Sequence, residues 1–151
     1  MINVQIDEAY SQEGLEEAVI EAADKALEIQ QIEISEVDLA IVITGDDQVR
    51  RLNRQYRGMN SSTDVLSFTN GDLDPDTNQR NLGDIIISFP QAHRQAQARQ
   101  GSDKSEIQLL VVHGILHLLG YDHADASQKQ QMWSLQLAVL KALKLDSINP
   151  A

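Results

Sequence analysis

The stretch from Lys104 to Leu119 is apolar on nearly every side of a helix, which predicts a helix buried at the centre of the fold. It carries His113 and His117, which are four residues apart and therefore share one helix face. Gly120 offers the left-handed backbone that commonly ends a helix, so His123 can return toward the first two histidines. Three converging imidazoles with a fourth position left open form the arrangement of a catalytic zinc site.

The histidine spacing matches a known hydrolase pattern with one difference. The frame H-x3-H-x2-G-x2-H is that of the metzincin zinc proteases, which carry a glutamate general base directly after the first histidine. Gly114 stands in that place here and cannot move a proton. The pattern therefore predicts a metal-dependent hydrolase that is not a peptidase. Zinc is favoured for three imidazoles, although nickel, copper or iron bind similar ligands.

The alternative is that these histidines are core residues packed beside Leu110 and Leu116. Each imidazole would then need its own buried hydrogen-bond partner. Three clustered histidines with a turn glycine between the second and third favour metal binding over that alternative.

Length and composition favour an ordinary globular protein. The chain has 151 residues, 42% hydrophobic and 23% charged, which predicts one domain over residues 1–151. There is no cysteine, so any metal must be held by imidazole, carboxylate or water. Since the N-terminus lacks a signal-peptide pattern and no apolar run reaches membrane-spanning length, a cytoplasmic location and no membrane partner are expected.

The net charge of −11 argues against a nucleic-acid partner when it is taken as a whole. The charge is unevenly distributed, however. Residues 50–104 hold eight of the twelve basic residues against six acids. This middle third of the chain either forms a basic patch or has its arginines on solvated helix faces, and the sequence favours neither.

The hydrophobic pattern predicts strands interleaved with helices, followed by helices only, which indicates an α+β fold with about four strands. Thr44 and Asp47 resemble a helix-capping pair, and Pro90 is suited to the first position of a helix. The tail after residue 143 is expected to be frayed. The predicted strands are 1–6, 36–43, 64–69 and 84–89, and the loop between the last two is 70–81. The predicted helices are 12–30, one through Val49, Leu52 and Tyr56, one that Pro90 opens and that carries His93, Arg94 and Arg99, about 104–119 and about 127–143.

Three segments together resemble the YbeY family of bacterial endoribonucleases and rRNA maturation factors. They are Leu52 to Phe68, Leu82 to Ser88 and His113 to His123, and the likeness extends from about residue 35 to 143. The resemblance implies a zincin-like fold with a mixed sheet, one Zn²⁺ per chain on His113, His117 and His123, and a role for Arg57 in activity. It implies single-strand-specific RNA cleavage in ribosomal RNA maturation and ribosome quality control. The implied partners are ribosomal RNA, the small ribosomal subunit and ribosome-associated proteins, but not DNA.

The chain departs from the family pattern beside Arg57. Met59, Asn60 and Ser62 occupy places where the family often has Lys, Asp and Pro, and Thr69 stands where Pro is common. The missing lysine predicts weaker phosphate binding, and the missing proline predicts a looser loop. Two other functions stay open at this point: a non-catalytic ribosome-assembly factor with structural zinc, and a metallopeptidase-like hydrolase. Asp122 is expected to orient a ligand histidine rather than to act as a general base.

Overall fold

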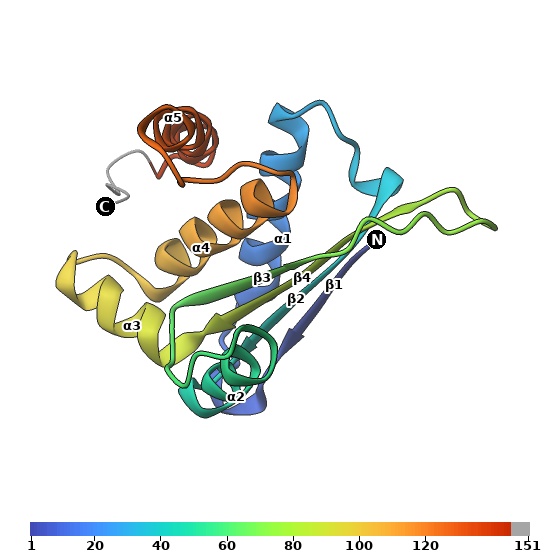
Figure 1. Ribbon diagram of the computed structural model, residues 1–151. Coiled ribbons are helices and arrows are strands. Elements are labelled where there is room, and N and C mark those ends of the chain that lie inside the picture. Colours follow the sequence, from blue (N-terminus) through green and yellow to red (C-terminus); the bar gives the residue numbers. More distant parts are fainter. Residues whose placement is uncertain (146–151) are drawn as a thin grey trace.

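The computed structural model describes residues 1–145, which form an α+β fold with a four-stranded sheet and five α-helices (Figure 1). The α+β class and the four-stranded mixed sheet are thus confirmed. The single domain over 1–151 stays a prediction, and most of the tail predicted to be frayed lies outside the described residues. The elements are β1 (Ile2–Ile6), α1 (Leu15–Ile29), β2 (Val37–Thr44), α2 (Asp46–Arg57), β3 (Val65–Thr69), β4 (Arg80–Ser88), α3 (Phe89–Ala98), α4 (Asp103–Leu118) and α5 (Ala126–Ala142), with short 3-10 helices at Glu8–Tyr10 and Ile34–Glu36.

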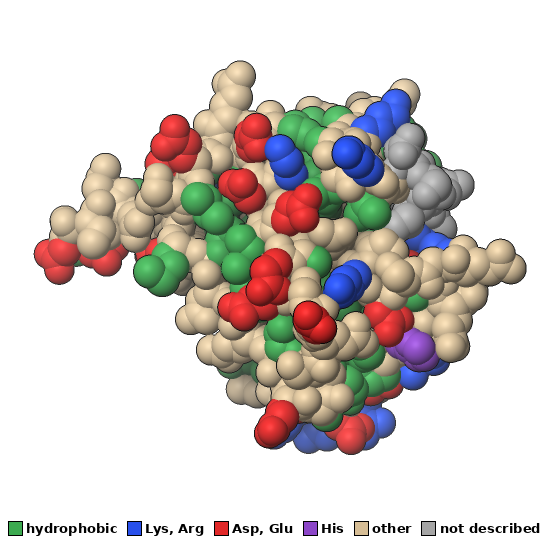
Figure 2. Space-filling view, turned by 180° about the vertical axis from the view of Figure 1, so that it is seen from behind, with side chains coloured by type: hydrophobic (Ala, Val, Ile, Leu, Met, Phe, Trp, Pro, Cys, Tyr) green, Lys and Arg blue, Asp and Glu red, His purple; other side chains and the backbone are tan. Residues whose placement is uncertain are grey.

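The sheet has the strand order β1-β2-β4-β3. β1, β2 and β4 are parallel, whereas β3 pairs with β4 in the antiparallel direction and forms one edge of the sheet. The loop between β3 and β4 protrudes from the body of the molecule, with exposed acidic side chains (Figures 1 and 2).

The helices divide unequally between the two faces of the sheet. α1, α4 and α5 lie on one side and α2 lies alone on the other, while α3 packs beside α4 at the end of the sheet (Figure 1). Successive side chains of β2 point to opposite faces of the sheet. Ile41 and Ile43 belong to the main core, whereas Val42 packs on the other face against a small cluster that includes Val49 of α2. The main core thus lies between the sheet and α1, α4 and α5.

α4 is the most buried helix of the described residues, as the apolar sequence predicts. It begins where the Ser102 hydroxyl accepts a hydrogen bond from the Ser105 amide, and eleven of its sixteen residues are buried. It contacts α1, α3, α5, β3 and β4. Gly114 lies against β4, and a Cβ atom at this position would come within 3.0 Å of the Ile85 side chain. The glycine therefore permits the close approach of α4 to the sheet.

Several predicted boundaries are wrong, among them the start of the first helix, which begins at Leu15 rather than at residue 12. Thr44 is the last residue of β2 rather than a cap, and Gly45 precedes α2 without a side-chain hydrogen bond. Phe89 starts α3 instead of ending β4, because the Ser88 hydroxyl accepts a hydrogen bond from the Gln91 amide and caps that helix. β4 also begins four residues earlier than predicted, at Arg80, since pairing with β2 extends it. Within residues 1–145 no helix is long and apolar enough to cross a membrane.

Candidate metal centre

The three predicted histidines lie together at the C-terminal end of α4. His113 and His117 lie on α4, and the chain then turns at Gly120, whose φ is 100°. The turn is closed by hydrogen bonds from the Gly120 amide to the His117 carbonyl and from the Tyr121 amide to the Leu116 carbonyl, both 3.0 Å. This turn brings His123 back, so that one ring nitrogen from each histidine lies within 4.8 Å of the others.

The spacing of the ring nitrogens suits a shared metal ion. The Nε2 atoms of His113 and His117 are 3.0 Å apart. Zn–N bonds of about 2.0–2.1 Å in a tetrahedral site place two ligand nitrogens about 3.3 Å apart. The His123 ring centroid lies 6.0 Å from that of His113 and 5.2 Å from that of His117. The three histidines can therefore bind one metal ion.

Gln136 of α5 orients the first of these rings. Its side-chain oxygen is 2.9 Å from Nδ1 of His113, and Gln136 itself is only 2% exposed. When Nδ1–H donates to this oxygen, the proton is fixed on Nδ1 and the Nε2 lone pair is left toward His117. This is the usual supporting contact of a metal-binding histidine. The sequence analysis missed Gln136, although an amide in the buried stripe of α5 between Met132 and Leu140 was a usable signal.

Both helical histidines are neutral at pH 7. Burial lowers the pKa of His113 below its ordinary value of 6.5, against the opposing effects of the Gln136 hydrogen bond and the Asp64 charge. Burial also lowers the pKa of His117 to about 4, and the neighbouring His113 and His123 act in the same direction. A neutral imidazole is the form that binds metal, so the surroundings of this pair favour a ligand role.

Arg57 reaches the same pocket from the other side of the sheet. The pocket has a volume of about 420 Å³ and is lined by the three histidines, by Arg57, by alternate residues of β3 and by the turn after α4. Arg57 is the last residue of α2, and its Nη2 donates to the Ser67 carbonyl of β3 at 3.0 Å. The guanidinium carbon also lies 5.7 Å from the centre of the Phe68 ring. These contacts hold a fixed positive charge in the pocket that contains the histidines.

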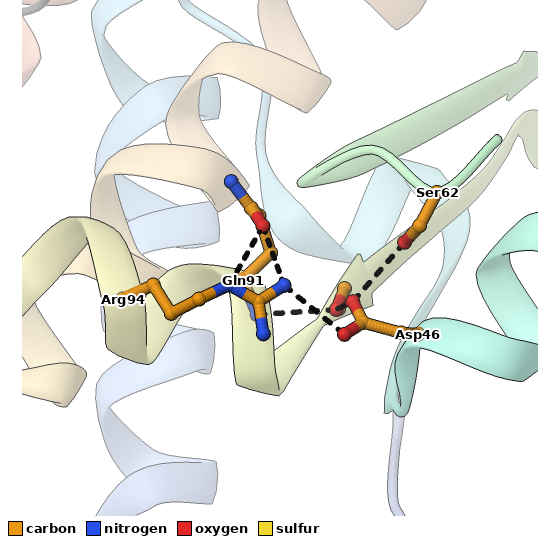
Figure 3. A network of polar contacts seen from close by, with 5 residues as sticks. Asp46, Ser62, Gln91 and Arg94 are labelled. Carbon is orange, nitrogen blue, oxygen red and sulfur yellow. Dashed lines mark hydrogen bonds and ion pairs between the residues drawn. The ribbon is translucent and has the colours of Figure 1, made fainter.

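A polar network at the start of α2 fixes this helix to the rest of the fold (Figure 3). Asp46 Oδ1 accepts from the Ser88 hydroxyl at 2.6 Å, and Oδ2 accepts from Arg94 Nη2 at 3.0 Å. Gln91 in turn accepts from Arg94. The Ser88 hydrogen bond is the largest cause of a lowered pKa for Asp46, with smaller contributions from Arg94 and Ser62 that burial opposes. Asp46 thus joins α2 to the end of β4 and to α3.

The loop after Arg57 is held at two points despite its departures from the family pattern. Ser62, in the place of the common proline, donates from its hydroxyl to Asp46 Oδ1 at 3.1 Å (Figure 3). Asn53, which is buried, donates from its side-chain amide to the Ser61 carbonyl at 2.9 Å. The looser loop expected from the missing proline is therefore countered by side-chain hydrogen bonds.

Other candidate residues take different places. Asp122 accepts a hydrogen bond from the backbone amide of His123 at 2.7 Å. It therefore stabilises the turn rather than hydrogen-bonding to a histidine ring. The fourth histidine, His93, pairs with Asp103 through a contact of 2.8 Å, and it is outside the metal-binding group. Gly114 faces Ile85, so a glutamate at this position would have to enter the space between α4 and β4. The glutamate general base of the metzincins therefore cannot be accommodated at position 114.

Comparison with known proteins identifies a family. The profile described as Endoribonuclease YbeY matches residues 1–144. A relative of that name from Persephonella marina is 41% identical over 127 residues, which cover 83% of this chain and 82% of the relative. Another from Halalkalibacterium halodurans is 33% identical over 156 residues, with 95% and 98% covered.

A solved structure agrees in fold. The solution structure of TM1509 from Thermotoga maritima superimposes with a TM-score of 0.59 at 24% sequence identity, over 99% of this chain and 97% of that chain. The family match extends almost from end to end and includes the segments that build the pocket. The chain belongs to the YbeY family.

Proposed function

We propose that this protein is a zinc-dependent endoribonuclease that cleaves single-stranded RNA at the pocket shared by the histidines and Arg57. One observation carries the proposal: three imidazoles able to bind a metal ion and a fixed guanidinium line one pocket. The name of the relatives, Endoribonuclease YbeY, points to RNA as the substrate.

The residues present fit a catalytic metal site of the zincin type. Three histidines supply the ligands, His123 is exposed, and the pocket in front of them is open to a substrate. Three protein ligands with a fourth position left free distinguish a catalytic from a structural zinc site. A bound zinc ion supplies Lewis acidity, which activates water and polarises a phosphoryl oxygen.

Arg57 is suited to bind the phosphate that reacts. One of its five N–H groups is used by the Ser67 carbonyl, which leaves donors for phosphoryl oxygens. Cleavage of a phosphodiester builds negative charge on these oxygens, and a planar guanidinium matches them with paired hydrogen bonds. Gln136 keeps His113 in the tautomer that the metal requires.

The family likeness supports a proposal for the cellular role. We propose ribosomal RNA maturation and ribosome quality control, with the small ribosomal subunit and its associated proteins as partners, in the cytoplasm. A metallopeptidase is disfavoured because Gly114 cannot be the base and has no space for one. A purely structural zinc is disfavoured by the open pocket around the histidines.

The decisive experiment compares Arg57→Ala with His117→Ala on a labelled single-stranded RNA. Arg57→Ala should reduce the cleavage rate about 100- to 1,000-fold with the zinc content unchanged, as expected when a transition-state donor is lost. His117→Ala should lose both zinc and cleavage, and its residual activity measures contaminating ribonuclease. Equal loss of zinc in both variants would refute the role of Arg57.

A metal-removal experiment separates the catalytic from the structural role of zinc. Protein stripped of metal should still unfold cooperatively and should regain cleavage when zinc is added back. Unfolding of the stripped protein would instead indicate a structural site. Hydrolysis of casein by the zinc-loaded protein, absent from His117→Ala, would favour the peptidase alternative.

A further inference from the structure

Tyr56 is a large aromatic residue left exposed beside the pocket. It lies in the last turn of α2, and 63% of its surface is exposed. Its ring packs against Phe68 of β3 with centroids 5.4 Å apart and planes at 59°. The Phe68 contact fixes the ring, while the remaining surface faces solvent.

Phe68 links this tyrosine to the metal pocket. It contacts Tyr56 and also lies under the Arg57 guanidinium. The residues on either side of it in β3, Ser67 and Thr69, line the pocket that holds the histidines. Tyr56 and the proposed cleavage site therefore lie on opposite faces of the edge strand β3.

Positive charge continues from the pocket along α2. Arg50, Arg54 and Arg57 are spaced i, i+4 and i+7 and share one side of the helix, which we call the α2 arginine face. All three are exposed, and none takes part in a salt bridge within residues 1–145. Arg50 and Arg54 line a second groove, of about 660 Å³, which Arg51 and the acidic Asp47 also line and which Tyr56 adjoins without lining it. From Arg57 back to Arg50 the helix rises about 10 Å.

Other parts of the surface are unsuited to a polyanion. α1 exposes Glu16, Glu17, Glu21, Asp24 and Glu28. Viewed from behind, the molecule shows acidic side chains across its face, with Lys and Arg side chains among them, and acidic side chains at the protruding β3–β4 loop (Figure 2). The charge of the described residues therefore directs a nucleic acid to the α2 arginine face.

We propose that single-stranded RNA leaving the metal pocket stacks one base on Tyr56 and lays its phosphates along the α2 arginine face. A groove of arginines combined with an exposed aromatic ring is the usual means of binding single strands without reading their sequence. The proposal rests on the proposed function, because it takes the strand to be held by the same pocket. It assigns Tyr56 to base stacking and Arg50 and Arg54 to phosphate binding.

The test measures binding separately from cleavage. The full-length chain carrying His117→Ala, which does not cleave, is titrated into a fluorescein-labelled single-stranded RNA dodecamer, read by anisotropy. Adding Tyr56→Ala should raise Kd by about 5- to 100-fold, the range for loss of one stacked base. Tyr56→Phe keeps the ring and should change Kd less than about twofold. Trp133→Ala, which removes an exposed aromatic residue beside Lys129 on α5, is the matched control and should have no effect.

An abasic dodecamer distinguishes base stacking from an indirect effect. The chain that carries only His117→Ala should bind the abasic RNA more weakly than the normal RNA. The chain that also carries Tyr56→Ala should bind both RNAs nearly alike. Arg50→Ala with Arg54→Ala should flatten the dependence of log Kd on log salt by about 1.4, at about 0.7 for each phosphate contact. Unchanged binding by Tyr56→Ala, or an equal response of both proteins to the abasic RNA, would overturn this inference while leaving cleavage at the histidines intact. Absence of both RNA binding and RNA cleavage in the zinc-loaded chain without any substitution would overturn the proposed function as well.

Discussion

Two helices contribute the main side chains of the pocket: α4 carries His113 and His117, and α2 carries Arg57. Different contacts hold the two helices in place. α4 buries eleven residues between the sheet and three other helices. α2 buries only Val49 and Asn53, and it depends on a small apolar cluster and on the network around Asp46. The histidines therefore share the rigidity of the core, whereas the position of Arg57 depends on a few polar contacts. Substitutions in α4 should act first on folding, and substitutions in α2 first on cleavage.

The largest effect is expected from Ile107→Ala in α4. Ile107 is fully buried in the main core, two turns before the histidines. Loss of its side chain should lower the free energy of unfolding by about 2–5 kcal/mol, measured by urea denaturation. The folded fraction should keep its metal, because no ligand is touched.

Val49→Ala is the matching change on the other face of the sheet. Val49 is also fully buried, but in the small cluster beneath α2. Removal of two methyl groups should lower the free energy of unfolding by about 1.5 kcal/mol. If Val49→Ala destabilised the protein as much as Ile107→Ala, the contrast between the two helices would be lost.

The second effect concerns the support of α4 from α5. Gln136→Ala removes the partner of His113 Nδ1. Zinc affinity should fall about 10- to 100-fold, as is typical when the supporting hydrogen bond of a ligand is lost. Competition with a zinc-binding dye measures the change. Gln131→Ala, on the exposed side of α5, is the control, and an equal loss of affinity in both would show that Gln136 has no special role.

The histidine site was predictable because its information is local. His113, His117, Gly120 and His123 lie within eleven residues, so helix geometry and one turn place them together. The strands and helices were also predictable, since the spacing of apolar residues within each segment indicates its secondary structure. The boundary errors at Thr44 and Phe89 arose where a neighbouring residue, rather than the pattern, decides where an element ends.

The supporting contacts were not predictable, because they join distant parts of the chain. Gln136 is 23 residues from His113, and Asp46 is 42 residues from Ser88 and 48 from Arg94. Nothing in the sequence near Asp46 distinguishes it from Asp47, which is exposed. Only the packing of α2, β4 and α3 at one corner gives Asp46 its partners.

The third effect tests this distinction between two neighbouring aspartates. Asp46→Asn weakens the network that fixes α2, so the free energy of unfolding should fall by about 1 kcal/mol. RNA cleavage should fall further than this loss explains, because Arg57 at the far end of α2 moves, while zinc content stays constant. Asp47→Asn removes the same charge without those partners and should leave the free energy of unfolding unchanged. Equal effects of the two substitutions would mean that net charge, rather than the network, is responsible.

The last effect separates the two helices by pH. In the metal-free protein the pKa of His113 is lowered below 6.5 and that of His117 to about 4. Because the unfolded histidines bind protons first, their contribution to stability is present above pH 6.5 and is lost as the pH falls toward 4. The pKa of Asp46 is lowered below 3.8, so its contribution is present above that pH and is lost only in stronger acid. The two helices thus lose stability in different pH ranges.

Urea denaturation of the metal-free protein from pH 7.5 to pH 3 can resolve these two ranges, because each has its own variant. His117→Ala should flatten the fall in unfolding free energy between pH 6.5 and 4 without changing the fall below 3.8. Asp46→Asn should do the reverse, since an amide does not titrate in this range and the contribution of the charged network is then already absent at every pH. If Asp46→Asn flattened the upper range instead, α2 would be coupled to the histidines through the core, and the independence of the two helices would be disproved.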